Sequence, residues 1–284
     1  MVLLPDHLQE LWEKVKSGHL SQEDFAREQA RLLGIYRSEW CNALLSDGVT
    51  DLRSSLVREA ASYYDISDLA AVERYFSNAV MTLQREWQAN VNANYRASIE
   101  NFYESPATVY ELMEWHSLRD DTGPLAYVLG LDIARSHSVQ HCLDFGSGVG
   151  AGALLFIRAG IEMTLADIST TLLSFARWRV ATRGVQAHFV DLKHESLPDG
   201  EFDMILAMDV FEHMSNPVDT MDHLSTALKP GGLLFARIHA ENDPDRPQHI
   251  VTDFGPTFER MEELGLVEKW ADKWLWGHQL FQKS

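Results

Sequence analysis

The segment Leu143-Asp144-Phe145-Gly146-Ser147-Gly148-Val149-Gly150 joins an acid to three alternating glycines. Glycine has no Cβ, so a backbone can turn sharply there and lie directly against a ligand. The helix predicted over residues 151–159 directs its N-terminal N–H groups into the same space. We therefore predict a site for a nucleotide-like ligand, with Gly146, Ser147, Gly148 and Gly150 in its loop.

Further acids follow the next predicted strands. Asp167 closes a strand over 161–166, Asp191 follows one over 186–190, and Asp209 ends one over 202–208. Asp167 also lies about 20 residues beyond Gly146, as in a dinucleotide-binding fingerprint. The carboxylate of Asp144, however, is better suited to contact a cationic ligand or to accept hydrogen bonds from the loop than to lie against a negatively charged pyrophosphate. Each acid also has a purely structural alternative, since Asp commonly caps loops and helix N-termini.

The elements that must position these acids alternate in type. Apolar runs predict strands at 141–145, 161–166, 186–190, 202–208 and 232–238, with helices near 151–159, 169–182 and 217–228. Such alternation with short loops predicts a parallel sheet that helices cover on both faces. After a helix at 257–264, two β-rich runs at 266–270 and 273–281 are joined by a very short connection. A link that short permits only antiparallel pairing.

Residues 1–105 read as helices. Leu69, Val72, Phe76, Val80, Leu83 and Trp87 form one apolar stripe at helical spacing. Ser21 with Asp24 resembles a capping box, and Ser105-Pro106 predicts the start of another helix. We predict an all-helical region over 1–105 and an α/β domain over 106–284.

Composition limits the class of protein. The chain has 284 residues and a formal net charge of −18, which disfavours nucleic acid as a partner. No apolar run approaches the roughly 20 residues of a membrane span, and the N-terminus lacks an export signal. Cys41 and Cys142 fit neither a disulfide framework nor a zinc pattern. We expect a soluble, cytoplasmic protein without a membrane span.

The ordered motifs over residues 141–284 resemble the class I S-adenosylmethionine-dependent methyltransferases. The similarity is strongest to the ubiquinone- and menaquinone-biosynthesis-like group, whose fourth strand often runs into a Glu-His pair, as at Glu212-His213 here. The resemblance implies a doubly wound, seven-stranded, mostly parallel sheet with an antiparallel last strand. It also implies S-adenosyl-L-methionine as cofactor and a small molecule as methyl acceptor.

The resemblance also implies roles for individual residues. Asp144 and the glycine loop would hold the methionine part of the cofactor, and Asp167, followed by Ile168, would bind its ribose. Asp191 and Leu192 would meet the adenine, whereas Met208 and Asp209 would line the cleft near the sulfonium. All of these residues are therefore candidates for cofactor binding.

Methyl transfer from a sulfonium is an in-line displacement, in which the protein mainly aligns the reactants and excludes water. His213 is the candidate general base, because it follows the fourth strand, at the edge where open α/β sheets bind ligands. Tyr103, His116 and His239 are candidates for substrate binding. The polar stretch 239–249 has irregular spacing and predicts no metal site.

Three interpretations of the whole chain remain open. The first is methyl transfer to oxygen, nitrogen or carbon of a small molecule, beneath a cap formed by residues 1–105. The second is methylation of a protein or peptide, such as natural-product tailoring. The third is a cofactor-binding sensor without catalysis. The helical region could also form a homodimer interface.

Overall fold

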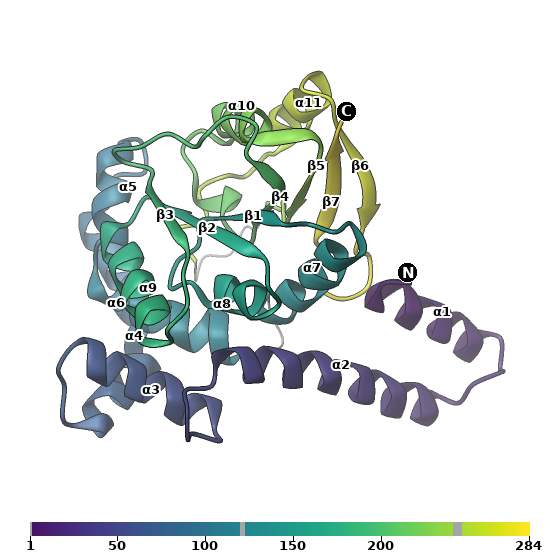
Figure 1. The fold of residues 1–284 in the computed structure, drawn as a ribbon, viewed down its shortest axis with the longest axis horizontal. Helices are drawn as coiled ribbons and strands as arrows, with labels where there is room; N and C mark the ends of the chain where they lie inside the picture. Colours follow the sequence, from purple (N-terminus) through teal and green to yellow (C-terminus); the bar gives the residue numbers. More distant parts are fainter. Residues whose placement is uncertain (1, 120–122, 241–245) are drawn as a thin grey trace.

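A computed structural model describes residues 2–119, 123–240 and 246–284 and shows a helical N-terminal part followed by an α/β domain (Figure 1). The N-terminal part contains α1 (Leu4–Lys16), α2 (Gln22–Leu44), α3 (Leu52–Tyr63), α4 (Leu69–Asn90), α5 (Arg96–Tyr103), α6 (Pro106–Met113) and the π-helical turn η1 (Glu114–Leu118). The elements that follow are α7 (Pro124–Ser136), β1 (His141–Phe145), α8 (Ala151–Arg158), β2 (Glu162–Asp167), α9 (Thr170–Thr182), β3 (His188–Asp191), β4 (Phe202–Ala207), the 3₁₀ turn η2 (Phe211–His213), α10 (Pro217–Ala227), β5 (Leu228–Ala236), α11 (Gly255–Glu263), β6 (Leu266–Ala271) and β7 (Gln279–Lys283). The predicted change from helices to alternation is therefore confirmed.

The sheet has seven strands in the order β3-β2-β1-β4-β5-β7-β6. Strands β1 to β5 pair in parallel, whereas β7 is antiparallel to both of its neighbours, β5 and β6. The fold class and the antiparallel last strand are confirmed. In the register, Asp167 of β2 lies opposite Asp191 of β3. The acids that were predicted to end these strands therefore lie at one edge of the sheet.

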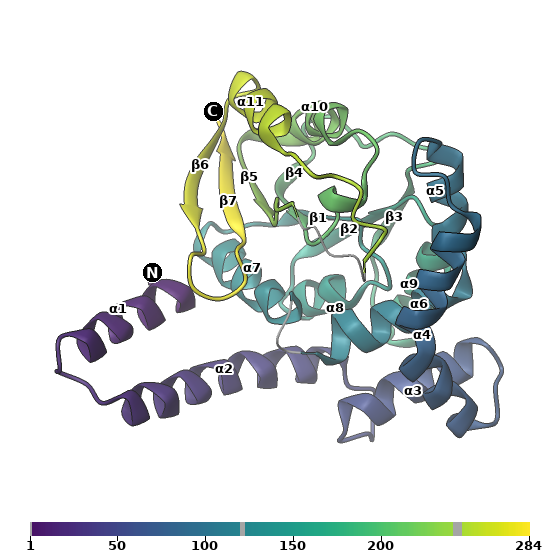
Figure 2. The same ribbon diagram turned by 180° about the vertical axis from the view of Figure 1, so that it is seen from behind.

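Helices cover both faces of this sheet (Figures 1 and 2). On one face Leu143, Ile205 and Leu234 pack in a cluster that includes residues of α10 and α11. On the other face Cys142 and Met204 pack in a larger cluster with residues of α7, α8 and α9. Because parallel strands are buried on both sides, they read as nearly continuous apolar runs in the sequence.

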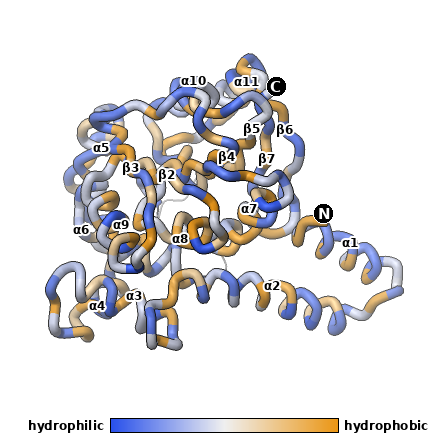
Figure 3. Tube along the Cα trace, viewed as in Figure 1, coloured by the Kyte–Doolittle hydropathy of each residue, from blue (hydrophilic) through white to orange (hydrophobic). Residues whose placement is uncertain are grey.

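The N-terminal helices begin where the sequence signals them and continue the larger of these clusters. Ser21 accepts a hydrogen bond from the backbone N–H of Asp24 (3.0 Å) at the start of α2, and Ser105 caps α6. Val72 and Phe76 of α4 are buried in the same hydrophobic cluster as the side chains on the sheet face that α7, α8 and α9 cover. In Figure 3, α1 and α2 alternate between hydrophilic and hydrophobic residues along their length, as expected of amphipathic helices. A domain boundary near residue 105 stays a prediction.

The connection between the last two strands is longer than predicted. Strand β7 begins at Gln279, so residues 272–278 form a turn instead of continuing the β-rich run. The carboxylate of Asp272 holds this turn by accepting hydrogen bonds from the N–H groups of Trp274, Leu275 and Trp276 (2.7–2.9 Å). Such local bonds to an Asp side chain compete with strand pairing. The predicted antiparallel pairing is nevertheless correct. None of the helices in the described ranges combines the length and apolar character needed to cross a membrane.

Candidate active site

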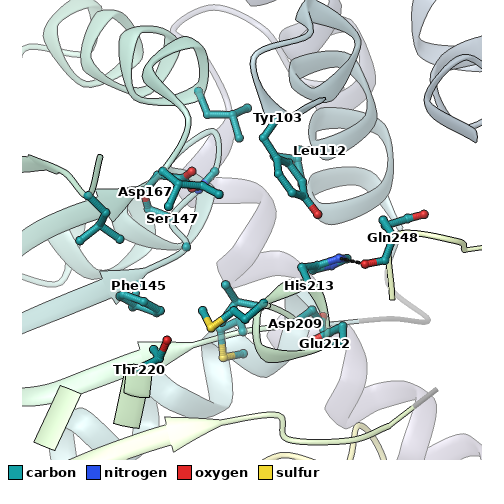
Figure 4. Close-up of a pocket in the computed structure, with 18 of the residues that line it drawn as sticks. Tyr103, Leu112, Phe145, Ser147, Asp167, Asp209, Glu212, His213, Thr220 and Gln248 are labelled. Carbon is teal, nitrogen blue, oxygen red and sulfur yellow. Dashed lines mark hydrogen bonds between the residues drawn. The ribbon is translucent and has the colours of Figure 1, made fainter. Parts of the chain in front are cut away.

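A cavity of about 1170 Å³ lies where the carboxyl ends of the central strands meet helices α4 to α6 (Figure 4). One side is lined by Phe145, the glycine loop and Asp167, and the other by Tyr103 and Glu111 of α5 and α6. Pockets that hold one drug-sized ligand occupy roughly 300–1,000 Å³. This cavity therefore has room for a cofactor and a second molecule together.

The glycine loop packs so closely against its neighbours that a side chain at Gly146 or Gly148 would clash with them. Gly146 and Gly148 have φ of +72° and +52°, in the left-handed region that favours glycine. A Cβ on Gly148 would lie 2.9 Å from Leu112, and one on Gly146 would overlap Val210. The hydroxyl of Ser147 is buried beside them and has no hydrogen-bond partner among the described residues. A buried polar group without a partner marks a place where a ligand can supply one.

Asp167 holds the loop together at the end of β2. Its carboxylate accepts hydrogen bonds from the N–H groups of Gly148 (2.9 Å) and Ser169 (2.8 Å). Burial raises the pKa of this carboxyl to about 6, although the backbone N–H groups act in the opposite direction. A carboxylate has about four acceptor positions, so capacity remains for ribose hydroxyls. Ile168 and Leu192 line the cavity next to it, as their predicted roles require.

Asp144 lies behind the loop and does not line the cavity. It is fully buried, and burial raises its pKa to about 7. The hydroxyl of Tyr127 in α7 donates a hydrogen bond to it (3.3 Å). The ring of Tyr127 occupies the space that a Cβ on Gly152 would need, so the two helices α7 and α8 approach closely here. Sequence reasoning missed Tyr127, because nothing local to residues 124–136 indicates this contact.

Three other candidates lie away from the cavity lining. Gly150 is the left-handed N-cap of α8 and packs against β2. Asp191 accepts hydrogen bonds from the hydroxyl of Thr170 (2.9 Å) and the N–H of Lys193 (3.1 Å). His239 is exposed. The sequence therefore predicts that Asp191 and His239 lie at the edge where the parallel strands end, but the fold does not bring their side chains to the cavity.

Glu104 was missed and ties the helical region to the α/β domain. It accepts hydrogen bonds from the N–H groups of Thr170 (3.0 Å) and Thr171 (2.9 Å) at the start of α9, and it pairs with Lys193. Burial opposes its ionisation, but these partners lower the pKa of its carboxyl to about 2. The adjacent backbone carbonyl of Tyr103 accepts a hydrogen bond from the hydroxyl of Ser169 (2.7 Å). These bonds fix Tyr103 over the cavity.

The rings of His213 and Tyr103 lie edge to face in the cavity lining, with their centroids 6.0 Å apart (Figure 4). Nδ1 of His213 lies 3.1 Å from the backbone carbonyl oxygen of Gln248. A carbonyl only accepts hydrogen bonds, so Nδ1 carries the proton and Nε2 keeps a lone pair. Burial, together with His249, lowers the pKa of His213 to about 3, so this imidazole is neutral near pH 7. The hydroxyl of Tyr103 is buried and has no hydrogen-bond partner within the described ranges.

The remaining candidates also line this part of the cavity. Met208, Asp209 and His116 do so, and Asp209 forms an ion pair with Arg237 (2.8 Å). Asp209 has a φ of +49°, a backbone strain that places its carboxylate at the turn after β4.

A cluster of three possible metal ligands concerns the prediction that the protein has no metal site. Glu212, His213 and His249 place potential ligand atoms within 4.8 Å of one another. His249 comes from the polar stretch 239–249, in which residues 241–245 lie outside the described residues. The spacing along the chain did not indicate that His249 would meet the Glu-His pair. The absence of a metal stays a prediction.

Comparison with known proteins identifies the domain. Residues 143–234 match a family described as "Methyltransferase domain". A ubiquinone biosynthesis O-methyltransferase of Xanthomonas euvesicatoria is 29% identical over 161 residues, which cover 51% of this chain and 65% of that protein. The corresponding protein of Xylella fastidiosa is 32% identical over 99 residues, covering 33% of this chain and 39% of its own length. The chain thus spans less than two thirds of these relatives.

Among solved structures, a phosphoethanolamine N-methyltransferase 2 of Haemonchus contortus, in complex with S-adenosyl-L-methionine, is 20% identical. The similarity covers 60% of this chain and 44% of that one, with a TM-score of 0.48.

The α/β part of the chain is a class I S-adenosylmethionine-dependent methyltransferase domain. The resemblance drawn from the sequence is confirmed, and so is S-adenosyl-L-methionine as the cofactor of this type of domain. Ubiquinone biosynthesis O-methyltransferases are its distant relatives. The residues that would hold the cofactor are the glycine loop, Asp167, Ile168 and Leu192, on the geometry described above.

Proposed function

We propose that this protein transfers a methyl group from S-adenosylmethionine to oxygen, nitrogen or carbon of a small molecule. The observation that carries the proposal is the single cavity, which joins the glycine loop and Asp167 to Tyr103, Glu111 and His213. A cofactor site and a polar acceptor site in one cavity are what an in-line transfer needs, since the reacting atoms must be held close together and in line.

The bound cofactor would supply an activated methyl group on a cationic sulfur. As the acceptor's bond to that methyl forms and the carbon–sulfur bond breaks, a proton must leave the acceptor if it is a hydroxyl or an amine. Nε2 of His213 has the free lone pair, and the side chain lines the cavity, so we assign Nε2 as the proton acceptor. Burial keeps this imidazole neutral near pH 7, so its lone pair is free, although a pKa of about 3 makes it a weaker base than an imidazole in water.

The helical region supports a small acceptor over a protein or peptide. Helices α5 and α6 lie directly over the cavity, with Tyr103, Thr108 and Glu111 in its lining, and Glu104 anchors them to α9. We infer that residues 1–105 act as a cap that shapes the acceptor site and excludes water. A homodimer through the same region is compatible with this role. The intact glycine loop and Asp167 weigh against a degenerate cofactor site, and turnover separates an enzyme from a sensor.

Two measurements test the proposal. Calorimetry should show binding of S-adenosylmethionine and S-adenosylhomocysteine and none of NAD. Incubation with S-adenosylmethionine and a small-molecule fraction of a cell extract should then release S-adenosylhomocysteine. Methyl label found only in protein would favour the peptide alternative, and cofactor binding without turnover on any fraction would favour the sensor. Tight binding of NAD alone would overturn the proposal.

A further inference from the structure

Two polar side chains in the cavity have no role in holding the cofactor. The hydroxyl of Tyr103 is buried without a hydrogen-bond partner in the described part of the chain. The carboxylate of Glu111 lines the same cavity from α6 and makes no hydrogen bond or ion pair with a described residue. Buried polar groups in proteins are almost always hydrogen-bonded, because an unpaired one costs about 1–3 kcal/mol. The Tyr103 hydroxyl therefore points to a ligand that supplies the missing partner, and the half-buried Glu111 carboxylate is open to the same cavity.

The two groups lie close enough to influence each other electrically. The charge of Glu111 contributes to raising the pKa of Tyr103, after burial and Glu212. Burial in turn raises the pKa of Glu111, against the weaker effects of His116 and Arg246. Arg246 lies over the ring of Trp115, 4.9 Å from its centroid, rather than against the Glu111 carboxylate. The position of Glu111 thus lacks a protein cation in direct contact.

The cavity as a whole carries more acidic than basic side chains. Among the guanidinium groups that line it, Arg96 pairs with Glu100 (2.6 Å) and Arg237 with Asp209 (2.8 Å). Carboxylates of Asp167, Glu195, Asp199, Glu212 and Asp219 line the cavity besides Glu111. A negative field of this kind attracts cations and disfavours carboxylate or phosphate groups.

An apolar surface adjoins these groups. Leu83, Ile99 and Phe102 of α4 and α5 belong to a small hydrophobic cluster of their own and also line the cavity. Part of the cavity wall is therefore suited to hydrocarbon, at the end where α4 and α5 meet.

We propose that the acceptor is an amine on an apolar body, with its amino group bound between the carboxylate of Glu111 and the hydroxyl of Tyr103 and its hydrocarbon against α4 and α5. Glu111 is thus a specificity-determining residue of the acceptor site, which selects against anionic molecules. An ammonium has three donors and no acceptor, so it satisfies both groups at once, and one of its protons must pass to the proposed base, His213, before its nitrogen can attack the methyl group. This inference rests on the proposed function, because it assigns the second ligand of the same cavity.

The test uses the full chain saturated with S-adenosylhomocysteine and matched probes on two skeletons. Binding of 2-phenylethylamine, 2-phenylethanol and phenylacetate, and of hexylamine, hexanol and hexanoate, is measured by calorimetry. We expect the amine of each set to bind at least tenfold more tightly than the alcohol and the carboxylate. Glu111→Gln, which keeps the shape and removes the charge, should abolish this preference, and Tyr103→Phe should reduce it by about threefold to tenfold, the loss of one hydrogen bond.

Glu259→Gln is the matched control, because it removes an exposed carboxylate that does not line the cavity and should leave the preference unchanged. The inference is overturned if no amine binds at millimolar concentration, if a carboxylate binds as tightly as its amine, or if Glu111→Gln keeps the preference. Binding of S-adenosylhomocysteine by every variant shows that each one is folded. The same measurement separates this inference from the proposed function. A wild-type chain that binds the cofactor but shows no preference for amines contradicts this inference alone. A wild-type chain that binds no cofactor contradicts the proposed function as well.

Discussion

The cofactor side of the cavity comes mainly from residues 143–168, with Leu192 beside them, whereas the acceptor side combines residues of α4 to α6 with the turn after β4 and residues 246–249. On the cofactor side, backbone N–H groups and left-handed glycines make the surface, and Asp167 is held by main-chain bonds. On the acceptor side, the surface consists of side chains such as Tyr103, Glu111 and His213. A backbone site is set by local sequence and suits one invariant ligand. A side-chain site can change its ligand with a few substitutions.

This contrast predicts that substitutions on the two sides separate binding from turnover. Changes on the cofactor side should alter stability and cofactor affinity. Changes on the acceptor side should alter turnover or acceptor choice while the cofactor still binds.

The largest expected effect concerns the buried acid behind the loop. The pKa of Asp144 is about 7 in the folded protein and 3.8 when unperturbed, so the native state holds this proton longer than the unfolded state. The group's contribution to stability is therefore complete below about pH 4 and is lost as the pH rises through about 7, a decrease of about 4 kcal/mol. Asp144→Asn should lack this decrease. Urea unfolding of both proteins across this pH range measures it, and a stability difference that does not vary with pH would contradict it.

His213→Ala should reduce turnover by about a hundredfold, within the range for loss of a general base, and leave the affinity for S-adenosylmethionine within about twofold. The reason is that His213 lies on the acceptor side, where its ring packs against Tyr103 and its Nδ1 bonds to Gln248. His223→Ala is the control, since His223 is exposed yet lines the same cavity. A loss of turnover below about tenfold would remove the proposed role of His213.

Asp167→Ala should weaken binding of S-adenosylmethionine by about 1–3 kcal/mol, or roughly fivefold to 150-fold, because ribose hydroxyls would lose their acceptor. Asp191→Ala should cost less, since Asp191 bonds to Thr170 and Lys193 outside the cavity. Calorimetry on the two variants measures which one loses more affinity for S-adenosylmethionine. An equal or larger loss for Asp191→Ala would restore the adenine role that the sequence predicted for it.

The affinity for S-adenosylmethionine should also depend on pH through Asp167. Its pKa is about 6, and hydroxyl donors need the ionised carboxylate, so a proton must leave on binding below that pH. The affinity should fall by up to about tenfold per pH unit below pH 6 and be constant above it. Asp167→Asn should flatten this profile. Calorimetry in buffers of different ionisation enthalpy would detect the released proton, and a wild-type profile as flat as the variant's would contradict the prediction.

The smallest expected effect is that of metal removal. Dialysis against EDTA should not change the affinity for S-adenosylmethionine, because the glycine loop and Asp167 do not include Glu212, His213 or His249. Because the sequence predicts no metal site, turnover should also be unchanged after dialysis against EDTA. Loss of turnover that a divalent cation restores would make this cluster a metal site and would change the role of His213 from base to ligand.

Most of the fold could be predicted from the sequence. Strands buried on both faces give apolar runs, helix starts carry Ser caps, and a glycine loop after the first strand requires φ values that only glycine adopts easily. The turn over 272–278 could not be predicted, because Asp272 bonds to three N–H groups whose geometry depends on the folded chain. The same holds for Tyr127 against Gly152 and for Glu104 against α9, which are contacts between distant segments.

The sequence by itself determined the order of the elements, the class of the domain and the position of Asp167 beside the loop, since each follows from neighbours along the chain. Only the tertiary structure decided which polar groups share the acceptor side. Tyr103, Glu111 and His213 meet because α5 and α6 pack over the carboxyl ends of the strands. Helix packing depends on the summed shape of many side chains, and no local pattern records which residues it brings face to face.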